Sequence, residues 1–198
     1  TSDDLQPSAV QEVSFALQSP GLAVSNIPDF DNSLTLSALK LESHYHPETK
    51  TIFLDGLRAE ITQGDQRLPL STSGKIDLYE ATQPFTVELS LGGVDMENLS
   101  SVWPSLLAVN PRAWVTENIT SGQAKANLTV NGYLHDTTTG GFGINNLSGT
   151  IDFTGGTTKY FRDFPAFTDL SGQAKFDTTA IVITLTQGTA NGVILEEG

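Results

Sequence analysis

The stretch Ala124-Lys-Ala-Asn-Leu-Thr-Val130 decides the fold, because apolar and polar residues alternate in it with a period of two. Successive side chains of a β-strand point to opposite faces, so this pattern predicts a strand with one dry face and one wet face. The same alternation recurs in Phe85-Thr-Val-Glu-Leu-Ser-Leu91 and in Leu57-Arg-Ala-Glu-Ile61. Strands of this kind are typical of antiparallel sheets. We therefore predict a mainly β, antiparallel protein.

The alternation changes phase once between Leu34 and Leu41. The apolar residues fall first at even positions, in Leu34, Leu36 and Ala38. They then fall at odd positions, in Leu39 and Leu41. A β-bulge, which is an extra residue in one strand of an antiparallel pair, produces such a shift and bends the sheet. The expected architecture is a curved or elongated β-groove, or a sandwich-like sheet, with short helical inserts.

The strand pattern stops between residues 95 and 120. Pro104 and Pro111 there suit the first turn of short helices, and Asn110 stands before Pro111 as an N-cap residue would. We predict two or three short helical pieces, the last over about residues 111–118. The chain then divides into an N-terminal strand set (1–94), a helical segment (95–120) and a C-terminal strand set (121–198), and the two strand sets are expected to be continuous.

Charge and cysteine content exclude several classes of function. Ten basic residues stand against 23 acidic ones, for a net charge of −13, and the basic residues are scattered. Binding to nucleic acid needs clustered Lys and Arg, so direct docking on a nucleic acid is excluded. The absence of Cys excludes thiol catalysis, thiolate metal sites and disulfides.

Neither a leader nor a membrane span is evident. No charged-then-apolar leader precedes Thr1, and no apolar run reaches the roughly 20 residues that span a bilayer. The last residues, Val193-Ile-Leu195, indicate a strand that enters a turn. We therefore expect an internal segment of a longer protein, with any targeting or anchoring signal outside it.

Two regions carry a more specific pattern than composition does. The first combines Leu99-Ser-Ser-Val-Trp-Pro104 with Asn110-Pro-Arg-Ala-Trp-Val115, and the second combines Leu147-Ser-Gly-Thr-Ile-Asp-Phe153 with Leu170-Ser-Gly-Gln-Ala-Lys-Phe176. Together they resemble the AsmA-like proteins of Gram-negative envelopes, the clan that includes the TamB and YhdP types. The resemblance covers about residues 94–192, and Ala166 stands where that family usually has a second Pro.

The resemblance implies a non-enzymatic periplasmic protein that is anchored in the inner membrane by a helix outside this segment. Its strands would curl into a β-groove for lipid transport between the inner and outer membranes or for outer-membrane biogenesis. Phospholipid or another acyl lipid and other envelope proteins are the implied partners, and no cofactor is implied. Open strand edges would also allow this segment to associate with a second copy.

The residues themselves are consistent with an open groove. An apolar sheet face needs a cover, and the sequence contains too little predicted helix to cover so many strands. An acyl chain on that face would gain roughly 0.8 kcal/mol for each buried methylene, with few polar groups to stop it from sliding. The candidate groove or core residues are Leu34, Leu36, Leu57, Ile61, Ile76, Val87, Leu89, Leu128, Val130, Ile151, Phe153 and Ile183.

Three aromatic residues are candidate helix-packing anchors. Trp103, Trp114 and Tyr160 each have a large apolar body and a polar atom, which suits a residue that holds a short helix onto a sheet. Contact with lipid is the alternative role for these rings.

His44 and His46 form the one histidine pair in the chain, with Glu42 and Glu48 nearby. Residues two apart in a strand share a face, so the pair has the spacing of two metal ligands. No third ligand is evident from the sequence. We therefore interpret the pair as two solvent-facing histidines near the hairpin turn at residues 46–50, and predict no metal site.

Catalytic motifs do not occur in the sequence, which contains no nucleophile elbow, phosphate loop or zinc-helix motif. A pair of catalytic carboxylates is set in space and leaves no sequence pattern. Two other functions therefore remain open beside the lipid groove. One is a β-sandwich interaction or adhesion domain with a closed core, and the other is a hydrolase with a carboxylate pair.

Overall fold

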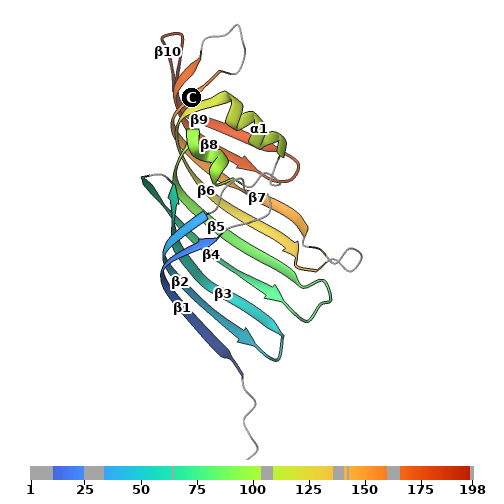
Figure 1. Cartoon of the computed structure of the whole chain (residues 1–198). Helices are drawn as coiled ribbons and strands as arrows, with labels where there is room; N and C mark the ends of the chain where they lie inside the picture. Colours follow the sequence, from blue (N-terminus) through green and yellow to red (C-terminus); the bar gives the residue numbers. More distant parts are fainter. Residues whose placement is uncertain are drawn as a thin grey trace, which may run out of the picture.

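The computed structural model describes residues 11–24, 34–63, 65–103, 109–135, 141, 143–159 and 166–196. The strands among them form one curved sheet (Figure 1). Its ten strands lie side by side in the order of the sequence, and every neighbouring pair is antiparallel. This confirms the mainly β, antiparallel fold. The strands are β1 (Val13–Val24), β2 (Leu34–His46), β3 (Thr51–Gln63), β4 (Gln66–Asp77), β5 (Pro84–Asp95), β6 (Ile119–Tyr133), β7 (Gly143–Thr158), β8 (Phe167–Phe176), β9 (Ile181–Ala190) and β10 (Val193–Glu196).

Two helical elements separate β5 from β6. They are the 3₁₀-helix η1 (Met96–Ser101) and the helix α1 (Val109–Asn118), so the prediction of short helical pieces here is confirmed. α1 ends at the expected residue and begins two residues before the predicted Pro111. Neither element has the length and apolar character that crossing a bilayer would need, within the described residues. β5 pairs directly with β6, so the sheet runs on without a break across this insertion.

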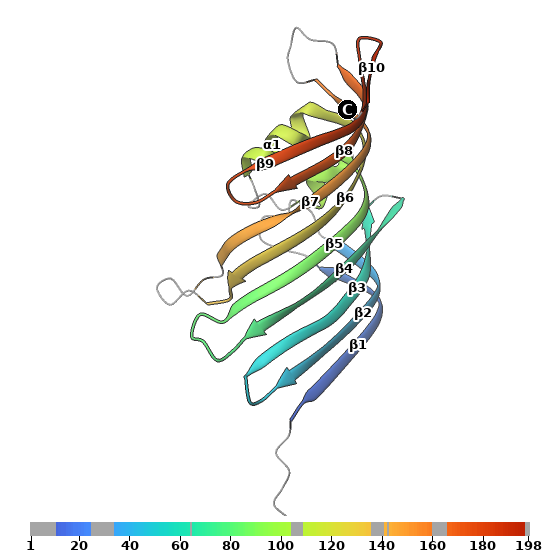
Figure 2. The same cartoon turned by 180° about the vertical axis from the view of Figure 1, so that it is seen from behind.

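The predicted bulge in β2 is present. The pairing of β2 with β3 shifts by one residue between Ser37 and Lys40, and Ala38 adopts a φ of 51°. A bulge of this kind bends its strand and increases the local twist. Beyond it, the end of β1 and the start of β2 turn toward the side of the sheet on which η1 and α1 lie (Figures 1 and 2).

The fully buried core is small and lies beneath η1. Ile61, Leu68 and Val94, from β3, β4 and β5, form the cluster, and Leu99 and Val102 pack against it from η1 and the turn that follows. Leu68 and Val94 are 1 % and 2 % exposed. The insertion between β5 and β6 therefore covers one end of one sheet face.

A glycine in β8 permits the close approach of atoms from the two neighbouring strands. Gly172 lies opposite Phe153 on one side and Leu185 on the other. A Cβ atom there would overlap the carbonyl oxygen of Thr184 and come within 3.1 Å of the Phe153 ring. Glycine inside a strand is typical of such close approach between backbones. Gly56 in β3, by contrast, has open space where its Cβ would be.

The substitution Gly172→Ala should therefore lower the free energy of unfolding by about 1–3 kcal/mol, the usual cost of inserting atoms into a filled space. Gly56→Ala is the matched control, and it should change stability by less than about 0.5 kcal/mol because its methyl group meets nothing. Urea unfolding followed by circular dichroism measures both values. Equal effects of the two substitutions would show that the close approach of neighbouring atoms does not require a glycine at residue 172.

The turn between β8 and β9 is closed by one carboxylate. Oδ1 of Asp177 accepts hydrogen bonds from Thr179 Oγ1 at 2.6 Å, the Thr179 amide at 2.7 Å and the Ala180 amide at 2.9 Å. These bonds favour the ionised form, so they lower the pKa of Asp177, and the Thr179 hydroxyl has the largest effect. The turn fixes the start of β9, at the C-terminal side of the sheet.

We expect the Asp177 carboxylate to stabilise the turn above its ordinary pKa and to lose that effect as the pH falls through the lowered, folded-state pKa. Thr179→Ala removes the strongest donor and should move the pKa of Asp177 upward, toward its ordinary value. Titration of the side-chain carboxyl carbon by NMR measures the midpoint in both proteins. An unchanged midpoint in the variant would contradict this account of the turn.

Candidate functional site

One face of the sheet is lined by aliphatic and aromatic side chains, and we call it the apolar face. Directly opposed residues in an antiparallel sheet share a face, so the register defines its membership. One cross-strand row runs through Leu57, Thr72, Leu89 and Leu128 of β3 to β6. The next row runs from β5 to β9 through Leu91, Ala126, Ile151, Ala174 and Ile183.

The register places eleven of the twelve predicted groove or core residues on the apolar face. Leu34 lies in β2, but its side chain is outside the described residues. The eleven are Leu36, Leu57, Ile61, Ile76, Val87, Leu89, Leu128, Val130, Ile151, Phe153 and Ile183.

Several members of the apolar face were missed in the sequence prediction. Phe15 and Leu17 come from β1, which was not recognised as a strand, and they pair with β2 residues of the same face. Leu68 and Leu70 in β4 alternate with Arg67 and Pro69, so the period-two signal was present there. The missed residues extend the face to the N-terminal edge of the sheet.

Exposure along the apolar face is uneven. The members nearest η1 are buried, and those in the middle of the sheet, such as Leu89 and Leu128, are half-buried. Members in the outer strands are exposed, with Leu17 at 53 % and Ile183 at 52 %. Within the described residues, a single sheet with η1 and α1 on one side leaves most of this face without a second layer.

Charge is segregated to the opposite face. Glu88, Lys125 and Asp152 alternate with members of the apolar face in β5, β6 and β7, and all three are exposed. Among the paired positions that define the apolar face in the described strands, none is charged. The polar exception in its central row is Thr72, whose hydroxyl donates to the Glu88 carbonyl at 2.7 Å, which leaves the row without an unsatisfied donor.

The predicted aromatic anchors are only partly described. Trp103 is half-buried beyond η1; its amide donates to the Leu99 carbonyl at 3.0 Å, and its own carbonyl accepts from Arg112 Nε at 3.0 Å. The second bond joins α1 to the end of η1. The side chain of Trp114 and the whole of Tyr160 lie outside the described residues.

The two outer strands present open edges. Among the described strands, β1 has a partner on one side only, and β10 pairs with β9 over Gln187–Ala190. Ile181, Val182 and Ile183 therefore lie on a stretch of β9 beyond the reach of β10, and all three are more than half exposed. Unpaired strand edges with apolar side chains are templates for further strands.

The histidine pair lies on the polar face near the β2–β3 turn. The sequence indicated no third ligand for it, and the structure brings Glu12 from just before β1 beside both rings. Neither Glu42 nor Glu48, the acids close to the pair in sequence, belongs to this group.

Comparison with family models, curated proteins and solved structures finds no match for this chain. The AsmA-like resemblance therefore stays a prediction.

The small core and the open face should respond differently to truncation. Leu68→Ala is expected to lower the free energy of unfolding by about 2–5 kcal/mol, because it leaves a cavity beneath η1. Leu17→Ala, on the same face but 53 % exposed, should cost less than about 1 kcal/mol. Thermal and urea unfolding measure both. A loss at Leu17 as large as that at Leu68 would show that the outer part of the face is covered in solution.

Proposed function

We propose that this chain is a non-enzymatic, AsmA-like segment of a cell-envelope protein, and that its apolar face carries the acyl chains of phospholipid. The observation that supports this most is the continuity of the apolar face from β1 to β9. Among the residues that the structure describes, its paired positions include no charged residue, and most of it has no cover. Large exposed apolar surfaces are typical of binding sites for apolar partners.

The dimensions of the sheet suit an acyl chain. Neighbouring strands lie about 4.8 Å apart, so a path across the apolar face from β1 to β9 crosses eight gaps and is about 38 Å long. That length exceeds the roughly 15 Å depth of one leaflet of the bilayer hydrocarbon. A chain extended across the strands therefore has room to lie on the face.

The energetics favour binding that still permits movement. Burial of ten methylenes contributes about 8 kcal/mol, whereas association costs at least about 4 kcal/mol. Contact with aliphatic side chains is non-directional, so a chain shifted by one strand meets an equivalent surface. Since the polar groups lie on the other face, the lipid headgroup would remain at the rim of the sheet or in water.

The location and partners follow from the resemblance to AsmA-like proteins. We propose a periplasmic location, a parent protein anchored in the inner membrane, and a role in lipid transport or outer-membrane biogenesis. The open edges at β1 and β9 would receive further strands of the parent protein or of other envelope proteins, which would lengthen the track. Such continuation would also remove the exposed edges.

The test uses a pair of substitutions on neighbouring residues of β6. Leu128→Lys places a charge in the middle of the apolar face, and Thr129→Lys places the same charge on the polar face. Desolvation of a charge is costly, so Leu128→Lys should weaken binding of a fluorescent fatty acid at least about tenfold, whereas Thr129→Lys should not change it. Circular dichroism of both variants checks that the sheet is retained.

Lipid extracted from the purified wild-type protein and analysed by mass spectrometry gives a second readout. Bound phospholipid, reduced in Leu128→Lys only, supports the proposal. Equal fatty-acid affinity in both variants, or a wild-type protein that neither retains lipid nor binds the probe, would refute it. If size-exclusion chromatography with light scattering then showed a dimer that Leu128→Lys dissociates, a closed interaction domain would be the better description.

A further inference from the structure

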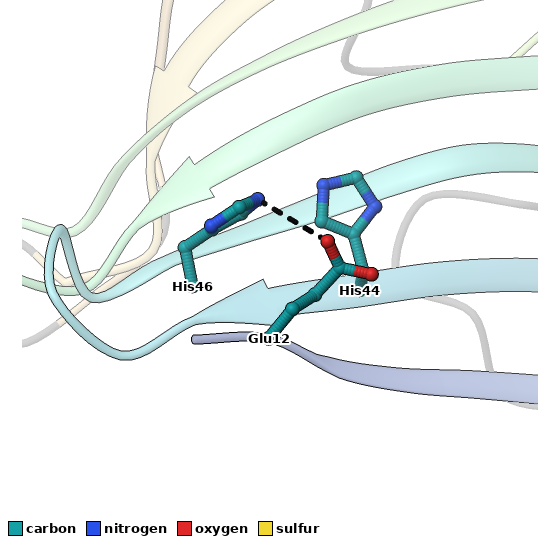
Figure 3. Close-up of side chains that lie close together, drawn as sticks. All are labelled: Glu12, His44 and His46. Carbon is teal, nitrogen blue, oxygen red and sulfur yellow. Dashed lines mark ion pairs between the residues drawn. The ribbon is translucent and has the colours of Figure 1, made fainter. Parts of the chain in front are cut away.

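A second cluster of functional side chains lies on the polar face, on the other side of the sheet from the proposed lipid track. Glu12, His44 and His46 each offer a ligand atom there, and these atoms lie within 4.8 Å of one another (Figure 3). The inference drawn from this cluster does not depend on the proposed lipid function.

Strand register brings the three residues together. His44 and His46 are two apart in β2 and share its polar face. Val13 pairs with Tyr45 in the antiparallel β1–β2 ladder, so Glu12 arrives beside His46, with its Oε2 at 3.8 Å from His46 Nε2. Glu12 Oε1 accepts a hydrogen bond from Ser14 at 2.9 Å, which limits the directions the carboxylate can take. Figure 3 shows the Glu12 carboxylate beside the His44 ring, with one of its oxygens joined to His46 by a dashed line.

A fourth residue fixes the orientation of His44. Nδ1 of His44 lies 2.7 Å from Oδ2 of Asp55. An ionised carboxylate only accepts, so His44 donates Nδ1–H, and in the neutral ring the lone pair then lies on Nε2. Asp55 reaches this position because the β2–β3 pairing shifts between Glu42 and Ser43, which leaves an extra residue in β3. Histidines that bind metals commonly make this bond to a carboxylate.

An aromatic ring restricts both imidazoles. Phe53 stacks on His44 with ring centroids 4.8 Å apart and planes 14° from parallel, and it meets His46 edge-on at 5.5 Å. Packing of this kind reduces the rotamers that the two rings can adopt, so less conformational entropy is lost when a ligand binds. His44 is the more enclosed of the pair, and its side chain is 22 % exposed.

We propose that Glu12, His44 and His46 bind a divalent transition-metal ion of the Zn²⁺ class, with Asp55 as the positioning residue for His44. Two imidazoles and one carboxylate are a zinc ligand set that leaves a coordination position for water or another donor. Zinc–ligand bonds of about 2.0–2.2 Å require the three ligand atoms to close to about 3.3 Å from one another. Rotation of the exposed Glu12 side chain, with a smaller adjustment of the half-buried His46 ring, supplies that closure.

The bound ion would join the edge strand to the sheet. Glu12 immediately precedes β1, the two histidines belong to β2, and Asp55 belongs to β3. A metal bridge from Glu12 to the two histidines would hold the N-terminal end of β1 against β2, which is the one neighbour of β1 among the described strands. Binding to the folded state alone stabilises that state by mass action.

The experiment titrates the metal-free protein with Zn²⁺, by isothermal calorimetry and by competition with a chromophoric chelator. His44→Ala and His46→Ala should each weaken the wild-type affinity at least about tenfold, and Asp55→Asn should weaken it roughly 10–100-fold. Glu12→Gln should weaken it less than either histidine substitution. The matched control is His135→Ala, which removes an exposed histidine outside the cluster and should leave the affinity unchanged.

Hydrogen exchange of β1 provides a readout that surface binding elsewhere would not change. Zn²⁺ should raise the protection of the β1 amides in the wild type and in His135→Ala, but not in the double variant His44→Ala/His46→Ala. Mg²⁺, which prefers oxygen ligands, should have no effect. The proposal is overturned if the double variant binds Zn²⁺ as tightly as the wild type, or if His135→Ala causes the same loss. A binding loss without any change in β1 protection would overturn the edge-bridging role.

Discussion

The structure depends on one constraint, which is that the strands keep the register that separates apolar from polar side chains. A slip of one residue between neighbours would exchange the two faces of a strand. The bulges preserve the separation where the sequence would otherwise lose it. In β3, Leu54 and Leu57 are three apart and yet both lie on the apolar face, because the pairing with β4 shifts between them. In β5, the shift between Leu91 and Val94 has the same result.

The same bulges bend the sheet, and they also position the side chains of Val94 and Asp55. The shift near Val94 brings this residue into the small core beneath η1, and the shift beside Ser43 brings Asp55 next to His44. A flat sheet with ideal pairing would do neither. These departures from regular pairing therefore determine two things: where η1 packs on the apolar face, and where Asp55 joins the histidines on the polar face.

Much of the fold could be predicted from the sequence because alternation is a local signal. The period of two alone places Leu89 and Leu128 on the dry faces of their strands, and the phase change before Leu39 locates the β2 bulge. The cluster around His44 could not be predicted in the same way. Glu12 is distant in sequence and reaches the pair only through the β1–β2 register. Asp55 depends on the bulge in β3, where the apolar phase changes between Leu54 and Leu57, but that change does not say which residue the bulge brings beside His44.

The order of the strands explains how a sheet with so small a core holds together. Every strand pairs with its neighbours in sequence, so each hairpin supplies hydrogen bonds and cross-strand contacts locally. Stability in such an arrangement approximates a sum over neighbouring pairs, as in repeat proteins, and does not require one central core. The outer strands, with one neighbour each, are then the least stable parts. A ligand on the apolar face and an ion that joins β1 to β2 would bind to opposite faces of the sheet. Both would stabilise an outer strand, which is the part with the fewest neighbours.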